Sequence, residues 1–224
     1  MKKFIALILA LLLAQTAFAS TPNFNDVGDD EIYRSGIEYL ANLGVINGNP
    51  DGSYKPLNTV NRAELVKILV EAQGASSAAS GCFPDLQAGA WYESYVCVAH
   101  DLGWVQGYQD GNFRPGQAVS FVEALKIVYK AYQLPYDDNA NPWYRDLVNQ
   151  ASNSNYIPHT ISAFDSGLQR NQMADLVARI EKDRAGELDQ YLGDRADIVV
   201  TYDTITDGID LTQLKKIILC AESC

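Results

Sequence analysis

Histidine is scarce in this chain of 224 residues, and the sequence contains no established catalytic motif. There are two histidines, His100 and His159, and neither has a motif partner. The chain has no Gly-x-Ser-x-Gly elbow, no Gly-rich phosphate loop and no His-Glu-x-x-His helix. Carboxylates are numerous enough for a glycosidase pair, but their abundance is not evidence for one. We therefore expect a protein that is not an enzyme, has no cofactor, and uses both histidines on its surface or in its structure.

Basic residues are also in deficit, because 17 Lys and Arg face 28 Asp and Glu, for a net charge of −11. Such a chain should not adhere to polyanions through bulk charge, so nucleic acid is an unfavourable partner. Any anionic ligand would need basic residues placed locally. No apolar run after residue 14 is long enough to span a bilayer, for which a helix needs ~20 residues.

The first 19 residues have the three-part pattern of a secretory signal peptide. Lys2 and Lys3 precede an apolar run over residues 4–14, and Ala17-Phe18-Ala19 forms a small-x-small cleavage site. An uncleaved anchor is the alternative. A bacterial lipoprotein is disfavoured, because no cysteine follows the apolar run.

Four cysteines lie after this segment, and an even number in an exported protein favours disulfides. Proximity favours Cys82–Cys97 and Cys220–Cys224, although three connectivities are open. Zinc is the rival reading. It is disfavoured because no Cys-x-x-Cys occurs and the two pairs lie far apart, so we expect no metal site.

Internal repetition is the main organisational signal. NGNPDGSYKPLNTVNRAEL at 47–65 returns 59 residues later as QGYQDGNFRPGQAVSFVEAL at 106–125. Each copy has a first helix with i, i+4, i+7 spacing and a second helix with one apolar stripe, typical of a shared core. A looser third copy follows. The second-helix stripes are Leu65, Ile68, Leu69 and Ala72; Ala124, Ile127, Val128 and Ala131; and Met173, Leu176, Val177 and Ile180.

The start of the second helix differs between copies at one informative position. Asn61 with Glu64, and Ser120 with Glu123, have the spacing of a capping box, so both glutamates are interpreted as structural. The residue after each cap is Arg62 in copy one, Phe121 in copy two and Arg170 in copy three. Because the helix can start without the arginine, Arg62 and Arg170 indicate a use outside the helix, with an ordinary exposed arginine as the alternative.

Taken together, these motifs resemble three tandem S-layer homology repeats. The family pattern appears in Phe24-Asn25-Asp26-Val27, Asp51-Gly52-Ser53-Tyr54-Lys55-Pro56 and Val60-Asn61-Arg62-Ala63-Glu64, and again in Phe83-Pro84-Asp85-Leu86, Trp91-Tyr92 and Asp110-Gly111-Asn112-Phe113-Arg114-Pro115. Copy three keeps Trp143-Tyr144 and Leu168-Gln169-Arg170. The resemblance implies an all-α fold, in which three helix–loop–helix repeats form a pseudo-threefold bundle with grooves between them.

The resemblance also implies a function. Family members bind cell-wall glycans in these grooves, often secondary polymers bearing acidic ketal-pyruvate groups, and the arginine of the repeat contacts the carboxylate. Guanidinium suits a carboxylate because it can pair with it bidentately. Arg62 and Arg170 are therefore the expected ligand-binding residues. Trp91 and Trp143 could stack on sugar rings, with core filling as their alternative. Phe121 puts one groove in doubt.

The expected organisation is a signal peptide at 1–19, a repeat domain at 20–184 with repeats at about 24–72, 83–131 and 143–183, and an extension of unknown role at 185–224. In the extension, residues 196–201 suggest a short strand, and Asp210 could cap a final helix. A calcium loop counted from Asp203 fails at its third and twelfth positions, Ile205 and Leu214. We expect secretion to the cell envelope and attachment to wall polysaccharide. The alternative is a structural module that binds other envelope proteins with degenerate grooves.

Overall fold

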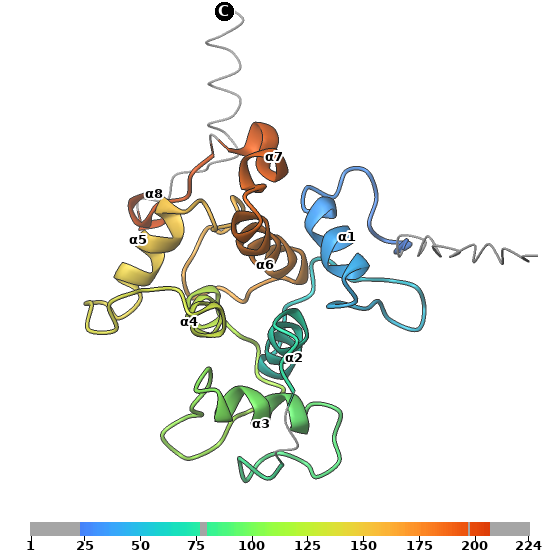
Figure 1. Cartoon of the computed structure of the whole chain (residues 1–224), viewed down its shortest axis with the longest axis vertical. Coiled ribbons are helices and arrows are strands. Elements are labelled where there is room, and N and C mark those ends of the chain that lie inside the picture. Colours follow the sequence, from blue (N-terminus) through green and yellow to red (C-terminus); the bar gives the residue numbers. More distant parts are fainter. Residues whose placement is uncertain (1–22, 77–79, 197, 207–224) are drawn as a thin grey trace, which may run out of the picture.

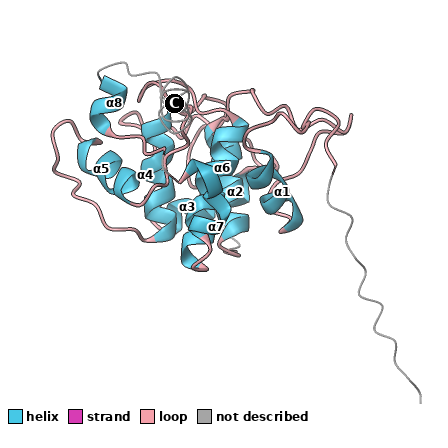
Figure 2. Ribbon diagram, turned by 90° about the horizontal axis from the view of Figure 1, so that it is seen from above, coloured by secondary structure: helices cyan, strands magenta, loops and turns pink. Residues whose placement is uncertain are grey.

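The computed structural model describes residues 23–76, 80–196 and 198–206, and this part of the chain is all-α, as expected. Figure 1 shows the helices around a common centre, and Figure 2 shows helices and connecting loops without a named strand among the residues drawn in colour. The helices are α1 (Arg34–Asn42), α2 (Arg62–Ala72), α3 (Glu93–Asp101), α4 (Phe121–Tyr132), α5 (Arg145–Asn153), α6 (Arg170–Arg184), α7 (Leu188–Leu192) and α8 (Tyr202–Thr206), with a 3-10 turn η1 (Gly193–Arg195) before α8.

Three helix–loop–helix units make up most of this part: α1 with α2, α3 with α4, and α5 with α6. The first helix of each unit packs on the second helix of a neighbouring unit: α1 lies against α6, α3 against α2, and α5 against α4. In Figure 1 the second helices α2, α4 and α6 are inner, and the first helices surround them. Each of the three junctions is therefore formed by a different pair of units.

A closed cycle of backbone hydrogen bonds joins the three units at the entry to their second helices. The Val60 N–H donates to Leu168 O at 2.8 Å, the Leu168 N–H to Val119 O at 3.0 Å, and the Val119 N–H to Val60 O at 3.1 Å. All three side chains are fully buried. Each unit thus satisfies a backbone donor of the next one, which gives the arrangement a pseudo-threefold character.

The predicted apolar stripes form the shared core. Eleven of the twelve second-helix positions are buried and Ala72 is half-buried against the core. The predicted first-helix positions Ile37, Leu40, Val96 and Val148 are buried as well. A helix with one apolar stripe has to bury it against another element, so the stripes are what draw the units together.

Both capping boxes expected at the second helices are present. The Glu64 N–H donates to Asn61 Oδ1 at 2.9 Å while the Glu64 carboxylate accepts from the Asn61 N–H, also at 2.9 Å. Ser120 and Glu123 form the same pair. In the third unit, Gln172 Oε1 accepts from the Gln169 N–H at 3.0 Å. All three helix starts are thus held by a residue at the third helical position.

A disulfide joins Cys82 to Cys97, and so ties the segment that enters the second unit to α3. Cys97 is fully buried and Cys82 is partly buried against the core. The predicted pairing is therefore confirmed for these two cysteines. The predicted Cys220–Cys224 pair, the helix expected from Asp210 and the signal segment all lie outside the described residues.

Replacing Cys82 and Cys97 together by alanine should lower the free energy of unfolding by about 3 kcal/mol, because the bond closes a short loop and restricts the unfolded chain. The bond spans a sequence separation of 15 residues. Urea denaturation of the double variant beside the parent protein measures the change. Free thiols at both positions in the parent, found by mass spectrometry after non-reducing digestion, would contradict the pairing.

The extension beyond α6 begins with two short helical elements, α7 and η1, followed by α8. The strand expected at residues 196–201 is wrong: residues 198–201 have no regular structure, and α8 begins directly after them. Val200 instead packs into the core as a single buried side chain. An apolar run in an extension can be buried by the bundle without any strand pairing. None of the described helices is both long and apolar enough to cross a membrane.

Candidate functional site

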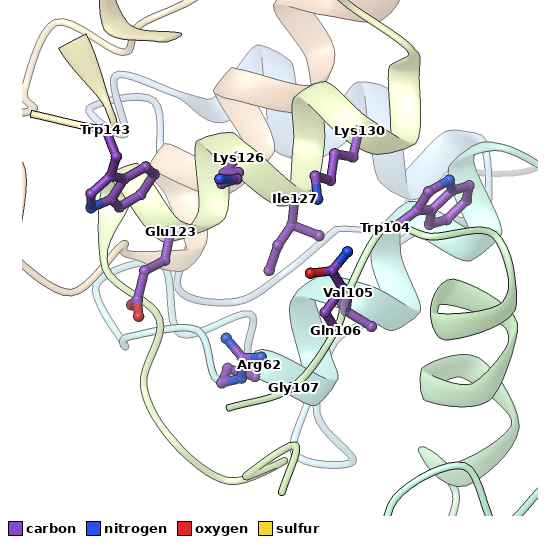
Figure 3. Close-up of a pocket in the computed structure, with 10 residues that line it drawn as sticks. All are labelled: Arg62, Trp104, Val105, Gln106, Gly107, Glu123, Lys126, Ile127, Lys130 and Trp143. Atoms are coloured by element: carbon purple, nitrogen blue, oxygen red, sulfur yellow. The ribbon is translucent and has the colours of Figure 1, made fainter. Parts of the chain in front are cut away.

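Two grooves lie at equivalent junctions between units. Groove A has a volume of about 160 Å³ and is lined by Ile46, Asn47, Glu64, Lys67, Ile68, Trp91 and Arg170. Groove B, shown in Figure 3, has a volume of about 190 Å³ and is lined by Arg62, Trp104, Val105, Gln106, Gly107, Glu123, Lys126, Ile127, Lys130 and Trp143. Every residue of groove A has its repeat equivalent in groove B. In each groove, one unit supplies the loop and second helix, a second unit the arginine, and the third unit the tryptophan.

The two predicted arginines occupy matching positions at the bases of these grooves. Arg62 Nε donates to Phe113 O at 2.8 Å, and Arg170 Nε donates to Tyr54 O at the same distance. The Arg62 guanidinium lies 4.7 Å from the Tyr108 and Phe113 ring centroids, and that of Arg170 lies 4.5 Å from the Tyr54 ring. The Nε–H bond and the aromatic contacts thus hold each arginine against the loop of the next unit, and Arg170 Nη2 also donates to Asn47 O at 3.5 Å.

The alternative interpretation, that Arg62 is an ordinary exposed side chain, is wrong. Arg62 is only 7% exposed. Its stem and ring-stacked guanidinium are part of the packing between units, so its loss should affect folding as well as any ligand. The sequence analysis missed this because the ring partners come from the loop of another copy, about 50 residues away.

Trp91 and Trp143 lie at the rims of grooves A and B, just before α3 and α5. They are 57% and 38% exposed, so the core-filling alternative is wrong for both. Each ring lies edge-to-face against the following tyrosine, Tyr92 or Tyr144, with centroids 5.4 Å apart. A half-exposed indole held by a neighbouring ring offers a fixed apolar face to a ligand.

A lysine occupies the centre of each groove, and the sequence analysis did not single it out. Lys67 Nζ donates to Val45 O at 2.8 Å in groove A, and burial lowers the pKa of its ammonium. Lys126 Nζ lies 2.6 Å from Asp138 Oδ1 and 5.2 Å from the centre of the Trp143 ring. The two lysines are 59 residues apart, so the repeat itself carried the signal that both belong to one kind of site.

The groove loops are held by aspartates that the sequence analysis quoted only as family pattern. Asp26 accepts from the N–H groups of Tyr54 and Lys55, both at 2.7 Å. Asp85 accepts in the same way from Phe113 and Arg114, at 2.8 and 2.6 Å. Lys55 and Arg114 both have a φ of 60°, a left-handed backbone conformation that residues other than glycine rarely adopt. The two carboxylates therefore stabilise turns whose backbone conformation is unfavourable. They position the carbonyl groups that hold Arg62 and Arg170.

The third junction, between α6 and α1, is filled by side chains. Phe121, which stands at the arginine position, is fully buried. Tyr33 is fully buried too, whereas its equivalents Tyr92 and Tyr144 are only partly buried, and its hydroxyl lies 2.9 Å from Thr160 Oγ1. Gln172, the equivalent of Glu64 and Glu123, donates to the same Thr160 oxygen at 3.0 Å. Hydrogen-bonded side chains therefore fill the space that corresponds to the glutamate and lysine of grooves A and B.

The extension completes this filling through Asp175, which stands where grooves A and B have Lys67 and Lys126. The fully buried Asp175 carboxylate accepts from Arg179 Nε at 2.7 Å, from the Tyr191 hydroxyl at 2.7 Å and from Arg195 Nη1 at 2.9 Å. Tyr191 belongs to α7 and Arg195 to η1. The extension is thus bound to the bundle through the Asp175 carboxylate, which occupies the position of the lysine in grooves A and B.

Gly36 lets α1 approach α6 closely enough to close the third junction. A Cβ at this position would lie 2.7 Å from the Tyr191 hydroxyl and 3.1 Å from Asp175 Cα, which is tighter than packed atoms allow. The equivalent residues at the open junctions are the larger Tyr95 and Leu147. The small residue at position 36 is thus one of the features that allow the third junction to close.

Neither histidine lies among the residues that line the two grooves. His100 contacts the edge of Phe83, with centroids 5.0 Å apart, and the His159 ring lies 5.3 Å from that of Tyr33. The described residues contain no group of three or more His, Cys, Asp or Glu side chains suited to a metal ion. The side chains that grooves A and B have in common include an arginine, a lysine, a carboxylate and an indole.

These features define a helical repeat protein with grooves between its units. Residues 23–66 and 83–125, which fall in the first two units, match the family model of the S-layer homology domain. The chain is 29% identical over 137 residues to the surface-layer 125 kDa protein of Lysinibacillus sphaericus. The aligned region makes up 59% of this chain and 12% of that protein. It is 27% identical over 188 residues to the middle cell wall protein of Brevibacillus brevis, and this alignment makes up 79% of this chain and 18% of that protein.

An enzyme also appears among the relatives. The exoglucanase XynX of Acetivibrio thermocellus is 32% identical over 113 residues, which make up 50% of this chain and 10% of the enzyme. The chain thus spans less than a fifth of each of these relatives.

Proposed function

We propose that this protein attaches non-covalently to the bacterial cell surface by binding an acidic cell-wall polysaccharide in grooves A and B. The observation that carries the proposal is that the two grooves repeat one set of groups: an arginine, a lysine, a capping glutamate and an exposed tryptophan. Side chains needed only for packing would not have to keep an indole exposed at both rims. A protein of net charge −11 needs such local positive groups to hold an acidic polymer.

Each group has a distinct role in this proposal. The arginine, fixed through Nε and an aromatic face, directs its remaining N–H groups to a carboxylate such as that of a ketal-pyruvate substituent. The lysine adds a second positive charge. The glutamate accepts from sugar hydroxyls while it caps the helix, and the indole stacks on the apolar face of a sugar ring. Fixing the arginine in advance reduces the entropy lost on binding.

The third unit is, in this proposal, a diverged third repeat that completes the bundle. Its support is the backbone cycle through Val60, Leu168 and Val119, in which all three units take equivalent parts. Residues 20–184 would then form one domain, and 185–224 an extension that closes the third junction. Residues 1–19 would direct export to the cell envelope, in keeping with relatives named as surface-layer and cell wall proteins.

Replacing Trp91 and Trp143 together by alanine should reduce retention on purified cell walls by at least about tenfold, since each stacked ring contributes about 1 kcal/mol or more. The measurement is a pull-down of the protein with purified walls, with and without removal of their secondary polymers. The control replaces Leu43 and Leu102 by alanine. These are 56% and 53% exposed, occupy equivalent positions at the ends of α1 and α3, and line neither groove.

Equal retention of the tryptophan variant, the leucine control and the parent would contradict the groove assignment. A parent protein that binds stripped and complete walls equally would contradict the polysaccharide itself. Either result would favour the second candidate, a structural module that binds other envelope proteins. The observation in favour of that candidate is the third junction, where the groups of a groove are already replaced by packed side chains.

A further inference from the structure

The two open grooves differ in charge at one helical position. On each of these second helices, the groove lysine follows the glutamate by three residues, and a third position follows the lysine by four residues, about one helical turn. In groove A this third residue is Glu71 of α2, and in groove B it is Lys130 of α4. Lys130 lines groove B, whereas Glu71 is not among the residues that line groove A.

The neighbouring first helix explains why the two side chains are placed differently. In groove A the Tyr95 hydroxyl of α3 donates to Glu71 Oε1 at 2.7 Å, which holds this carboxylate towards α3. The equivalent of Tyr95 at groove B is Leu147 of α5, which is fully buried and has no polar group to offer. Figure 3 shows Lys130 on the same helix as Lys126, beside Ile127 and across from Gln106.

The charge difference persists when the nearest acidic groups are counted. Groove B is lined by Arg62, Lys126, Lys130 and Glu123, a balance of +2. Groove A is lined by Arg170, Lys67 and Glu64, a balance of +1. Asp138, which pairs with Lys126, and Glu71 each lower the balance of their own groove by one. Groove B therefore stays one unit more positive than groove A.

We propose that groove B selects a sugar unit carrying two negative charges and groove A one carrying a single negative charge, with Lys130 as the residue that sets the difference. This inference rests on the proposed function of the grooves in binding an acidic polysaccharide. The ligand class of groove B is a sugar bearing a phosphate monoester or two carboxylates, and that of groove A is a sugar bearing one carboxylate. The two grooves of one molecule would then read two different units of a wall polymer.

The size of the effect follows from one additional charge pair. At a separation of ~5 Å in a solvated groove, one added pair of unit charges changes affinity about four- to fivefold. Salt should reduce it, because the screening length falls from ~30 Å at 0.01 M to ~8 Å at 0.15 M ionic strength. A ligand with a single negative charge can pair with the arginine in either groove and should distinguish the two much less.

The test is an NMR titration of the full chain, in which the indole N–H signals report each groove separately. The protein has three tryptophans, with Trp91 at groove A and Trp104 and Trp143 at groove B. The probes are glucuronate, which carries one charge, and glucose 6-phosphate, which carries nearly two at pH 7.5 because the second phosphate pKa is about 6. Both are glucose derivatives charged at the same end of the ring, so they differ chiefly in charge.

Glucose 6-phosphate should bind groove B about four- to fivefold more tightly than groove A at 0.01 M salt, and glucuronate should bind both nearly equally. Lys130→Gln, which removes the one charge by which the grooves differ, should abolish the preference of groove B, and Lys130→Glu should reverse it. Glu71→Gln should make groove A bind glucose 6-phosphate as tightly as groove B, and Glu71→Lys should make groove A the tighter of the two. The amide oxygen introduced by Glu71→Gln could still accept from Tyr95.

Equal affinities of both grooves for glucose 6-phosphate, or a preference unchanged in both Lys130 variants, would overturn the inference while leaving the proposed function standing. Perturbation of neither set of indole signals by either probe would overturn it as well. In that case the wall pull-down decides separately whether the grooves bind polysaccharide at all. A spectrum that keeps the dispersion of the parent shows that each variant is folded.

Discussion

Replacing Asp175 by alanine should lower the free energy of unfolding by about 3–5 kcal/mol. Asp175 is fully buried and accepts from three donors, two of which are charged: Arg179, Arg195 and the Tyr191 hydroxyl. Arg179 is also fully buried. Without the carboxylate, the positive charge of Arg179 would be left in the core with no ion-pair partner among the residues that the structure describes.

Thermal and urea denaturation measure this change. The control is Asp189→Ala, which removes a carboxylate from an exposed position on α7 and should shift the free energy of unfolding by less than ~0.5 kcal/mol. Limited proteolysis of the Asp175 variant should cleave the chain beyond α6 faster than in the parent, because the extension loses two of its contacts with the bundle. Equal stability of the two variants would mean that the extension is not held through Asp175.

Replacing Arg62 and Arg170 together by alanine should reduce retention on cell walls by at least about 100-fold, since each charge-assisted contact contributes about 1.5–3 kcal/mol. Because both arginines also hold a carbonyl group and an aromatic face, each replacement should cost about 1–2 kcal/mol of stability. Binding therefore has to be measured well below the melting temperature of the variant, with circular dichroism as the check on folding.

Phe121→Ala is the matched control, because Phe121 occupies the arginine position of the third unit. Its ring is fully buried, so its removal should cost about 3–5 kcal/mol of stability and leave wall retention unchanged. The two variants should thus show opposite patterns, one losing mainly binding and the other only stability. Arginine variants that are folded and retained like the parent would show that the guanidinium groups do not contact the polymer.

Local patterns in the sequence were sufficient to predict the individual elements. The three pairs of helices follow from apolar spacing, and the capping residues Asn61 and Ser120 mark where α2 and α4 begin. The Cys82–Cys97 bond follows from proximity in the chain. These features depend on residues within a few turns of one another, so a pattern of residue types is enough to predict them. The predicted strand at 196–201 failed because Val200 is buried by the bundle, which no local pattern reveals.

The composition of the grooves was decided only by the tertiary structure. Repetition made Arg62, Arg170, Trp91 and Trp143 candidates, but it could not tell which of them share a groove. The backbone cycle closes the chain into a ring, and this brings Arg170 next to Tyr54, which lies 116 positions earlier. For the same reason the burial of Arg62 by the loop of another unit could not be read from its own helix.

The closure of the third junction was likewise beyond the sequence alone. Phe121 was a visible departure from the repeat, but the roles of Gly36 and Asp175 depend on the approach of α1 to α6 and on the place of the extension. Whether a junction is open or filled depends on how closely two helices pack, and that distance is set by side chains from three separate parts of the chain. The sequence by itself therefore determined the repeated unit, whereas the packing between units determined which junctions remain open to a ligand.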